Sequence, residues 1–248
     1  MSDAIKHECG IVLLRLRKPL QYYIDKYKTP SYAVNKMYLL MQKQLNRGQD
    51  GVGVANIKID MKPGYRYISR YRTIDSQPIE TLFQKIGRKY QKALREGEEK
   101  YMDGAWLKQN VAFSGEVWMG HLRYGTHGKN NIENCHPFLR QNNWRSRNLV
   151  VAGNFNMTNV DELFEKLIEL GQHPKEKVDT VTAMEKIGHF LDEENELIFR
   201  KHKKTHSKAD LTQLIEDKID LQRVLNRSCK DFDGGYAITG MVGYGAAF

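Results

Sequence analysis

Apolar positions along the chain follow two different spacings, one typical of strands and one typical of helices. Residues 9–17 form an apolar run followed by apolar–charged alternation, which predicts a strand whose first half is buried on both faces. From Ser31 to Leu45 the apolar side chains recur at helical spacing. The same patterns predict strands at 52–59, about 65–73, 116–122, 148–152 and 235–243, helices at about 78–96, 160–168, 181–191 and 211–225, and a surface loop at 96–104.

Strand groups therefore alternate with helix groups along the sequence. Such an order favours stacked layers of sheet and helix. Neither an internal repeat nor a low-complexity linker divides the chain, so the pattern favours one domain.

Composition removes several classes of protein. The chain has 248 residues, and Tyr, Phe and Trp supply 10% of them, which excludes disorder as its main character. No apolar stretch approaches the roughly 18 residues that a membrane helix needs. The N-terminus lacks the apolar region of a secretory signal. Three scattered cysteines are too few for a disulfide framework or a zinc site, so we expect a cytoplasmic protein with reduced thiols and no metal.

The positive charge raises the question of nucleic acid. Lys and Arg number 39 against 30 Asp and Glu, a formal charge of +9. The densest basic run, Arg200–Lys204, lies between two helical patterns and contains no aromatic residue that would stack on bases. A solvated loop is therefore the favoured interpretation of the run, a polyanion contact is the alternative, and nucleic acid is an unlikely partner.

Three glycine-containing segments carry polar residues beside predicted strands. Cys9 begins the first strand, and by itself it is best explained as a small core thiol. Arg123, in Gly120–Gly128, can present a guanidinium to a carboxylate or form a surface salt bridge. Asn154, in Val150–Asn156, can donate to an oxyanion or form an Asx-turn.

The order of these segments is more specific than any one of them. Cys-Gly-Ile-Val at 9–12, Asn-Arg-Gly-Gln-Asp-Gly at 46–51, Gly-His-Leu-Arg-Tyr-Gly-Thr at 120–126, Ala-Gly-Asn-Phe-Asn at 152–156 and Val-Asp-Thr at 178–180 resemble the motifs of class II glutamine amidotransferases. These are N-terminal nucleophile hydrolases. Within that group the chain looks most like the glutaminase domain of amidophosphoribosyltransferases, which open purine biosynthesis.

The resemblance implies an α+β fold, a four-layer αββα sandwich of two antiparallel sheets. It also implies an enzyme that hydrolyses glutamine to glutamate and ammonia through a cysteine thioester. Cys9 would be the nucleophile. Asn154 would offer its side-chain N–H to the oxyanion, and Phe155 a backbone N–H. Arg47 and Gly48 match the loop that supports the nucleophile.

Three further residues would bind the substrate glutamine. By the resemblance, Arg123 holds the α-carboxylate, Asp179 holds the α-ammonium group, and Thr126 lines the same pocket. Two opposite charges at the amino-acid end would make the site specific for glutamine.

The chain departs from the family in two places. The family uses the α-amine of an N-terminal cysteine as its base, whereas Met1–Glu8 precede Cys9 here, so the resemblance implies a propeptide that is cleaved after Glu8. The family commonly has His-Asn-Gly where this chain has Gly153-Asn154-Phe155. A left-handed conformation at Phe155 would cost on the order of 1 kcal/mol.

The other candidate residues receive structural interpretations. His121 and His136 are predicted to be hydrogen-bonded structural histidines, because the α-amine already fills the role of base. A Cys135–His136 protease dyad is disfavoured because sequence neighbours rarely form one. Cys229 is predicted to be inert.

The domain prediction is a propeptide at 1–8 and a type 2 glutamine amidotransferase domain at 9–248, truncated before a phosphoribosyltransferase domain. That domain would be the partner and would bring Mg²⁺ and phosphoribosyl pyrophosphate, with no cofactor in this chain and a homo-oligomer at full length. The alternatives are a glutaminase domain serving another acceptor, such as fructose 6-phosphate, and a catalytically silent glutamine-binding module. A nucleic-acid binder ranks last.

Overall fold

Residues 8–125, 131–174 and 176–248 are described by a computed structural model, and they fall into two units. The first unit contains the described residues up to Pro137 together with Ala152–Asn154. The second unit contains Phe138–Val151 and Phe155–Phe248.

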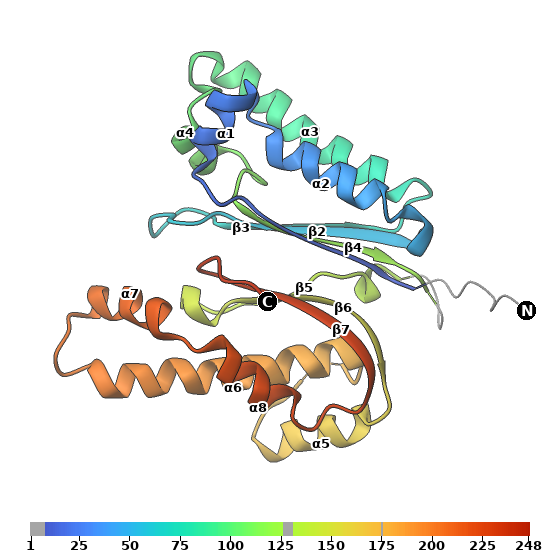
Figure 1. Cartoon of the computed structure of the whole chain (residues 1–248), viewed down its shortest axis with the longest axis vertical. Coiled ribbons are helices and arrows are strands. Elements are labelled where there is room, and N and C mark those ends of the chain that lie inside the picture. Colours follow the sequence, from blue (N-terminus) through green and yellow to red (C-terminus); the bar gives the residue numbers. More distant parts are fainter. Residues whose placement is uncertain (1–7, 126–130, 175) are drawn as a thin grey trace, which may run out of the picture. The chain divides into compact units, whose positions relative to one another are not determined.

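The first unit is built on a four-stranded antiparallel sheet (Figure 1). Its two central strands, β4 and β2, are buried along their whole length, as their near-continuous apolar and small residues require. In spatial order the strands are β1 (Gly10–Arg15), β4 (Val117–Arg123), β2 (Gly51–Ile57) and β3 (Ile68–Thr73).

Helices cover one face of this sheet (Figure 1). Trp118 and Leu122 of β4 and Val54 of β2 pack there in a core that also contains Met37 and Leu82 from the helices. The helices are α1 (Leu20–Tyr27), α2 (Tyr32–Gln42), α3 (Pro78–Glu96) and α4 (Gly104–Asn110), with 3₁₀ turns at η1 (Leu45–Arg47) and η2 (Glu98–Lys100).

The second unit combines a three-stranded sheet with helices. Leu149, Val151 and Val242 from the strands pack against Ile187 and Leu191 of the long helix α6. The strands lie in the order β5 (Phe138–Arg140), β6 (Leu149–Met157) and β7 (Gly234–Val242). The helices are α5 (Val160–Glu169), α6 (Asp179–His202), α7 (Lys208–Lys218) and α8 (Leu221–Cys229), and a 3₁₀ turn, η4, spans Arg145–Arg147. The remaining 3₁₀ turn, η3 (Ile132–Asn134), belongs to the first unit.

Ion pairs tie α6 to its neighbours in the second unit. Arg140 of β5 reaches Glu185 at 3.1 Å and Asp192 at 2.6 Å. Buried Glu194 pairs with Arg223 of α8. These ion pairs join α6 to β5 and to α8.

The predicted elements are largely confirmed, with α3 matching its expected range of 78–96. Two predictions are wrong. The pattern at 211–225 is two helices, because Asp220 caps α8 by accepting a hydrogen bond from the Arg223 N–H at 3.0 Å. The basic run is partly helical, since α6 continues to His202 and only the following residues form a turn.

The fold class is α+β with two sheets, as expected. The four-layer sandwich stays a prediction. In the described part of the chain, no helix has the length and hydropathy needed to cross a membrane.

Two glycines give a test of the helix-covered face. A β-carbon on Gly120 of β4 would lie 2.3 Å from Cε of Met37 and 2.7 Å from Sδ of Met41, whereas one on Gly87 of α3 would meet nothing within 4 Å. We expect Gly120→Ala to lower the free energy of unfolding by about 1–3 kcal/mol through overpacking. Gly87→Ala, the matched control, should raise it by about 0.5–1 kcal/mol. Chemical denaturation measures both, and equal effects would contradict the packing described.

Candidate active site

The face of the first sheet opposite the helices carries the predicted nucleophile. Gly10 pairs with Leu122 and Ile11 with His121. Successive residues of a strand point to opposite faces of the sheet, and paired residues of β1 and β4 lie on the same face. Leu122 is in the helix-covered core, which places His121 and Arg123 on the other face. Cys9 directly precedes β1, and the same alternation places it on the face of His121 and Arg123.

Cys9 is partly buried and contacts the residue that follows β4. The backbone N–H of Tyr124 points to its Sγ, with N and Sγ 3.5 Å apart. Nε of Arg47 donates to the carbonyl oxygen of Cys9 at 3.4 Å, and Nη2 of Arg47 pairs with the Glu8 carboxylate at 2.9 Å. Arg47 therefore holds both sides of the Glu8–Cys9 junction.

The loop between η1 and β2 crosses the end of β4 at very short range. A β-carbon on Gly48 would lie 2.6 Å from both C and O of Arg123, so only glycine lets the two backbones approach. The Asp50 N–H donates to the carbonyl of Arg123 at 3.1 Å, and Oδ2 of Asp50 accepts from the Gly125 N–H at 2.7 Å. The loop is thus bonded to the segment that carries Arg123.

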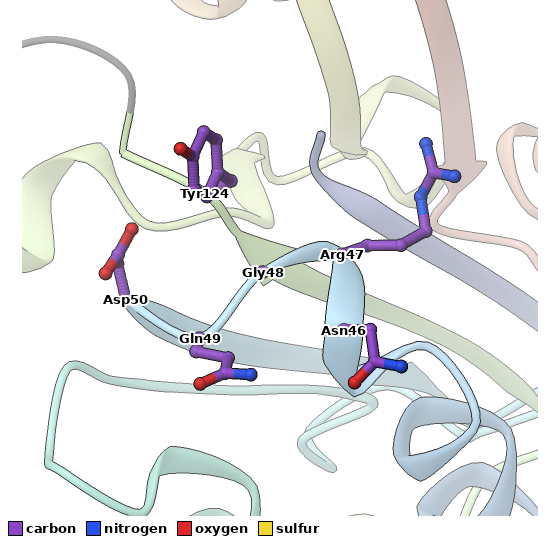
Figure 2. Close-up of a pocket in the computed structure, with 6 residues that line it drawn as sticks. All are labelled: Asn46, Arg47, Gly48, Gln49, Asp50 and Tyr124. Atoms are coloured by element: carbon purple, nitrogen blue, oxygen red, sulfur yellow. The ribbon is translucent and has the colours of Figure 1, made fainter. Parts of the chain in front are cut away.

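An open pocket of about 230 Å³ lies at this loop. In Figure 2, Asp50 and Tyr124 lie on one side of Gly48, and the side chain of Arg47 extends toward the other. Two lining residues, Arg47 and Tyr124, also contact Cys9, so the pocket adjoins the thiol. The lining residues are Asn46, Arg47, Gly48, Gln49, Asp50 and Tyr124.

Arg123, the predicted carboxylate ligand, is 7% exposed at the end of β4. Its Nη2 lies 3.7 Å from the position that a β-carbon on Gly125 would occupy. A guanidinium can hold a carboxylate through two parallel N–H···O hydrogen bonds. Thr126, predicted to line the same pocket, lies outside the described residues.

Two buried histidines occupy the same face of the sheet. Nε2 of His121 is 3.1 Å from the carbonyl oxygen of Gly153, and the Gly153 N–H donates to Nδ1 of His136 at 3.3 Å. The prediction that both histidines are hydrogen-bonded is confirmed. Burial lowers the pKa of His121 to about 4, with the Arg123 charge acting in the same direction. The pKa of His136 is lowered well below its usual value, by burial and then by His121.

Two glycines of β2 make room for the segment that contains His136. A β-carbon on Gly53 would lie 1.9 Å from the carbonyl oxygen of His136, and one on Gly51 would lie 3.3 Å from Sγ of Cys135. Burial raises the pKa of the Cys135 thiol to about 11. A protonated thiol beside a histidine whose Nδ1 is already engaged does not form a nucleophilic pair.

The remaining predicted residues lie on β6 and α6. Asn154 is half-buried and follows the peptide held by the two histidines. Phe155 continues β6 and is not among the residues with positive φ, so the anticipated left-handed strain is absent. Asp179 is the first residue of α6 in the second unit, where its Oδ1 accepts from the Thr180 N–H at 2.7 Å.

The structure thus brings Cys9, Arg47, Gly48 and Arg123 together in the first unit. It adds Asp50 and Tyr124, which the sequence analysis did not single out as site residues. Both lie inside the motifs at 46–51 and 120–126, and this position in the motifs could have marked them as site residues.

No family model matches the chain. Amidophosphoribosyltransferase from Archaeoglobus fulgidus is 28% identical over 109 residues, which cover 43% of this chain and 23% of that protein. Glutamine–fructose-6-phosphate aminotransferase (isomerizing) from Sulfurisphaera tokodaii is 32% identical over 100 residues, 40% of this chain and 16% of that protein. These two matches support a relationship to the class II glutamine amidotransferases.

The matched segments span less than a quarter of either relative. A solved structure, glutamine phosphoribosylpyrophosphate (PRPP) amidotransferase from B. subtilis complexed with ADP and GMP, is 20% identical, with a TM-score of 0.45, and the match covers 95% of this chain and 35% of that chain.

The buried histidines predict a stability that depends on pH. An unfolded histidine titrates near pH 6.5, whereas His121 in the folded chain takes up a proton only near pH 4. The unfolded chain therefore binds more protons between these values, so stability is fully present above about pH 6.5 and is lost as the pH falls toward 4. The loss from His121 is on the order of 3 kcal/mol at pH 4.

Denaturation curves at several pH values measure this loss. We expect His121→Gln, which does not titrate, to flatten the dependence between pH 6.5 and 4. His173→Gln is the matched control because His173 is exposed. If the His121 variant kept the full wild-type slope, the buried neutral state of this ring would be contradicted.

Proposed function

We propose that the chain is the glutaminase domain of a class II glutamine amidotransferase, with Cys9 as the nucleophile. The single observation that carries the proposal is the position of Cys9. Its thiol lies beside a pocket at the end of β4, and the buried Arg123 stands on the same face of the sheet. A thiol next to a buried cation that is suited to a carboxylate is what hydrolysis of an amino-acid amide requires.

The proposed chemistry proceeds in two steps. The thiol of Cys9 attacks the side-chain amide carbon of glutamine, and its proton passes by way of the α-amine to the leaving nitrogen. The C–N bond breaks, ammonia leaves, and a γ-glutamyl thioester remains. Water then hydrolyses the thioester to glutamate and restores the thiol. Asn154 and the Phe155 N–H would stabilise the oxyanion in both steps.

The α-nitrogen of Cys9 is an amide while Glu8 is attached, and an amide cannot act as a base. We therefore propose that Met1–Glu8 is a propeptide. Support comes from Arg47, which pairs with the Glu8 carboxylate and binds the Cys9 carbonyl. Cleavage would remove the first of these contacts and leave the second, so Arg47 and Gly48 would go on supporting the nucleophile.

Substrate binding would use opposite charges at the two ends of the α-carbon. Arg123 would bind the α-carboxylate, with Thr126 in the same pocket, and Asp179 would bind the α-ammonium group. The four-layer αββα arrangement of the N-terminal nucleophile hydrolases is part of the same proposal. So are a cytoplasmic location and a homo-oligomer at full length.

The proposed acceptor of ammonia is phosphoribosyl pyrophosphate, bound with Mg²⁺ on a phosphoribosyltransferase domain outside this chain, as in purine biosynthesis. The second candidate is fructose 6-phosphate, because the chain is also 32% identical over 100 residues to an aminotransferase named for that sugar. Ammonia transfer by the full-length protein to one acceptor or the other distinguishes them. A silent glutamine-binding module would bind glutamine after cleavage without turning it over.

Cleavage and activity should be linked. We expect purified, active protein to have the intact mass of a chain that begins at Cys9. A variant whose 1–8 segment cannot be removed should release no glutamate from glutamine, and Cys9→Ala should also be inactive. Cys229→Ser, a change at a cysteine outside the site, should keep wild-type activity. Full activity of the uncleaved form would contradict the proposal.

Arg123 should control affinity for glutamine. Arg123→Lys keeps the charge and loses the two parallel hydrogen bonds, so we expect KM for glutamine to rise roughly 10- to 100-fold. The rate of Cys9 alkylation by iodoacetamide, a reagent without an α-carboxylate, should change little. A variant with unchanged KM would exclude Arg123 from carboxylate binding.

A further inference from the structure

The peptide group of Gly153 is held from both sides by imidazole rings. Its N–H donates to Nδ1 of His136 at 3.3 Å, and its carbonyl oxygen is 3.1 Å from Nε2 of His121. The two ring centroids are 4.2 Å apart, and both side chains and Gly153 are buried in the first unit. One peptide therefore donates a hydrogen bond to one ring and accepts one from the adjacent ring.

The hydrogen bonds determine the proton positions on both rings. Nδ1 of His136 accepts a hydrogen bond from the Gly153 N–H, so this nitrogen carries no hydrogen, and the neutral ring has its hydrogen on Nε2. His121 must donate to a carbonyl, so its hydrogen is also on Nε2. The positive charge of Arg123 lowers the pKa of both rings, and that of Arg72 lowers the pKa of His136, so neither arginine favours a second proton.

This arrangement replaces a missing strand partner. β5 pairs with β6 only from Leu149 to Val151, the last pair being Phe138 with Val151. Continuing that register would place His136 opposite Gly153. The His136 backbone is not available for a ladder, because its carbonyl oxygen is packed against Gly53 of β2. Side chains therefore hold the peptide at the point where the β5 ladder has ended.

Burying the His121 ring leaves one polar atom unsatisfied, so the ring is not the residue that packing alone would favour. Nδ1 of His121 is buried and has no hydrogen-bond partner among the described residues. An apolar side chain of similar size would avoid this unsatisfied acceptor. Unlike an apolar side chain, the His121 ring can donate a hydrogen bond from Nε2 to the carbonyl oxygen of Gly153.

We propose that His121 and His136 are positioning residues that hold the Gly153 peptide, and with it the side chain of Asn154 next in the chain, in the orientation needed to meet the oxyanion. The inference rests on the proposed function, since it takes Asn154 as the oxyanion donor. Neither ring touches the substrate or moves a proton in the reaction. Their effect is on the transition state, where the donor must be aligned, and not on the amino-acid end of glutamine.

The first experiment examines the hydrogen bonds in the full chain. With ¹⁵N-labelled histidine, NMR should show both rings as the neutral Nε2–H form between pH 5.5 and 8. Amide exchange at Gly153 should be slow in the wild type and faster in His136→Leu, which removes the acceptor of this N–H, while amides of β1 remain protected. A positively charged or Nδ1–H form of either ring, or unchanged exchange at Gly153, would overturn the inference.

The second experiment separates positioning from mere stability. In protein processed to begin at Cys9, we expect His121→Leu to lower kcat for glutamine hydrolysis roughly 10- to 100-fold, with KM changed by less than about threefold. His121→Gln, which carries an N–H donor near the place of Nε2, should recover most of the lost kcat. His136→Asn keeps a hydrogen-bond acceptor near the place of Nδ1, so its kcat should likewise be higher than that of His136→Leu.

The outcomes distinguish this inference from the proposed function. A wild-type protein that begins at Cys9 and hydrolyses no glutamine would refute the proposed function, and the exchange data would then decide by themselves whether the rings hold Gly153. An active wild type whose Leu and Gln variants at His121 have equal kcat would overturn the positioning role alone. So would a kcat loss that matches the loss of folded protein, measured by thermal unfolding of each variant.

Discussion

Gly51 and Gly53 have no side chains on the face of β2 that carries the candidate site, and the rest of that face depends on this absence. A β-carbon on Gly53 would overlap the His136 carbonyl. Because the segment before β5 can approach the sheet so closely, His136 reaches the ring of His121 and the peptide of Gly153. Two glycines in a buried strand weaken it locally, and the close approach of another backbone is what they make possible.

The same principle operates at the end of β4. Gly48 lets its loop lie against the backbone of Arg123, and the hydrogen bonds of Asp50 to Arg123 and Gly125 join loop and strand. Cys9 contacts the Tyr124 backbone there, and its carbonyl oxygen accepts from Arg47. Each of these contacts has a backbone group on at least one side, so the geometry of the site depends on the main chain as well as on the side chains.

Charge has a different role in the second unit. The carboxylates of α6 pair with arginines from β5 and α8, as in Arg140 with Asp192 and Arg223 with Glu194. These arginines are engaged in ion pairs, whereas the formal charge of +9 is the excess of basic over acidic residues and is not changed by such pairs. A net charge counts residues, and only their positions show which of them face solvent.

The sequence by itself determined most strands and helices, because apolar spacing reports burial directly, and the order of its motifs determined the relationship to glutamine amidotransferases. It also predicted that His121 and His136 are hydrogen-bonded. It did not predict α1, α4 or β5, whose short patterns are ambiguous, nor the break before Asp220, which depends on a cap. Tertiary structure alone decided that two distant histidines meet on one peptide, since hydrogen bonds between residues far apart in the chain leave no periodic signal.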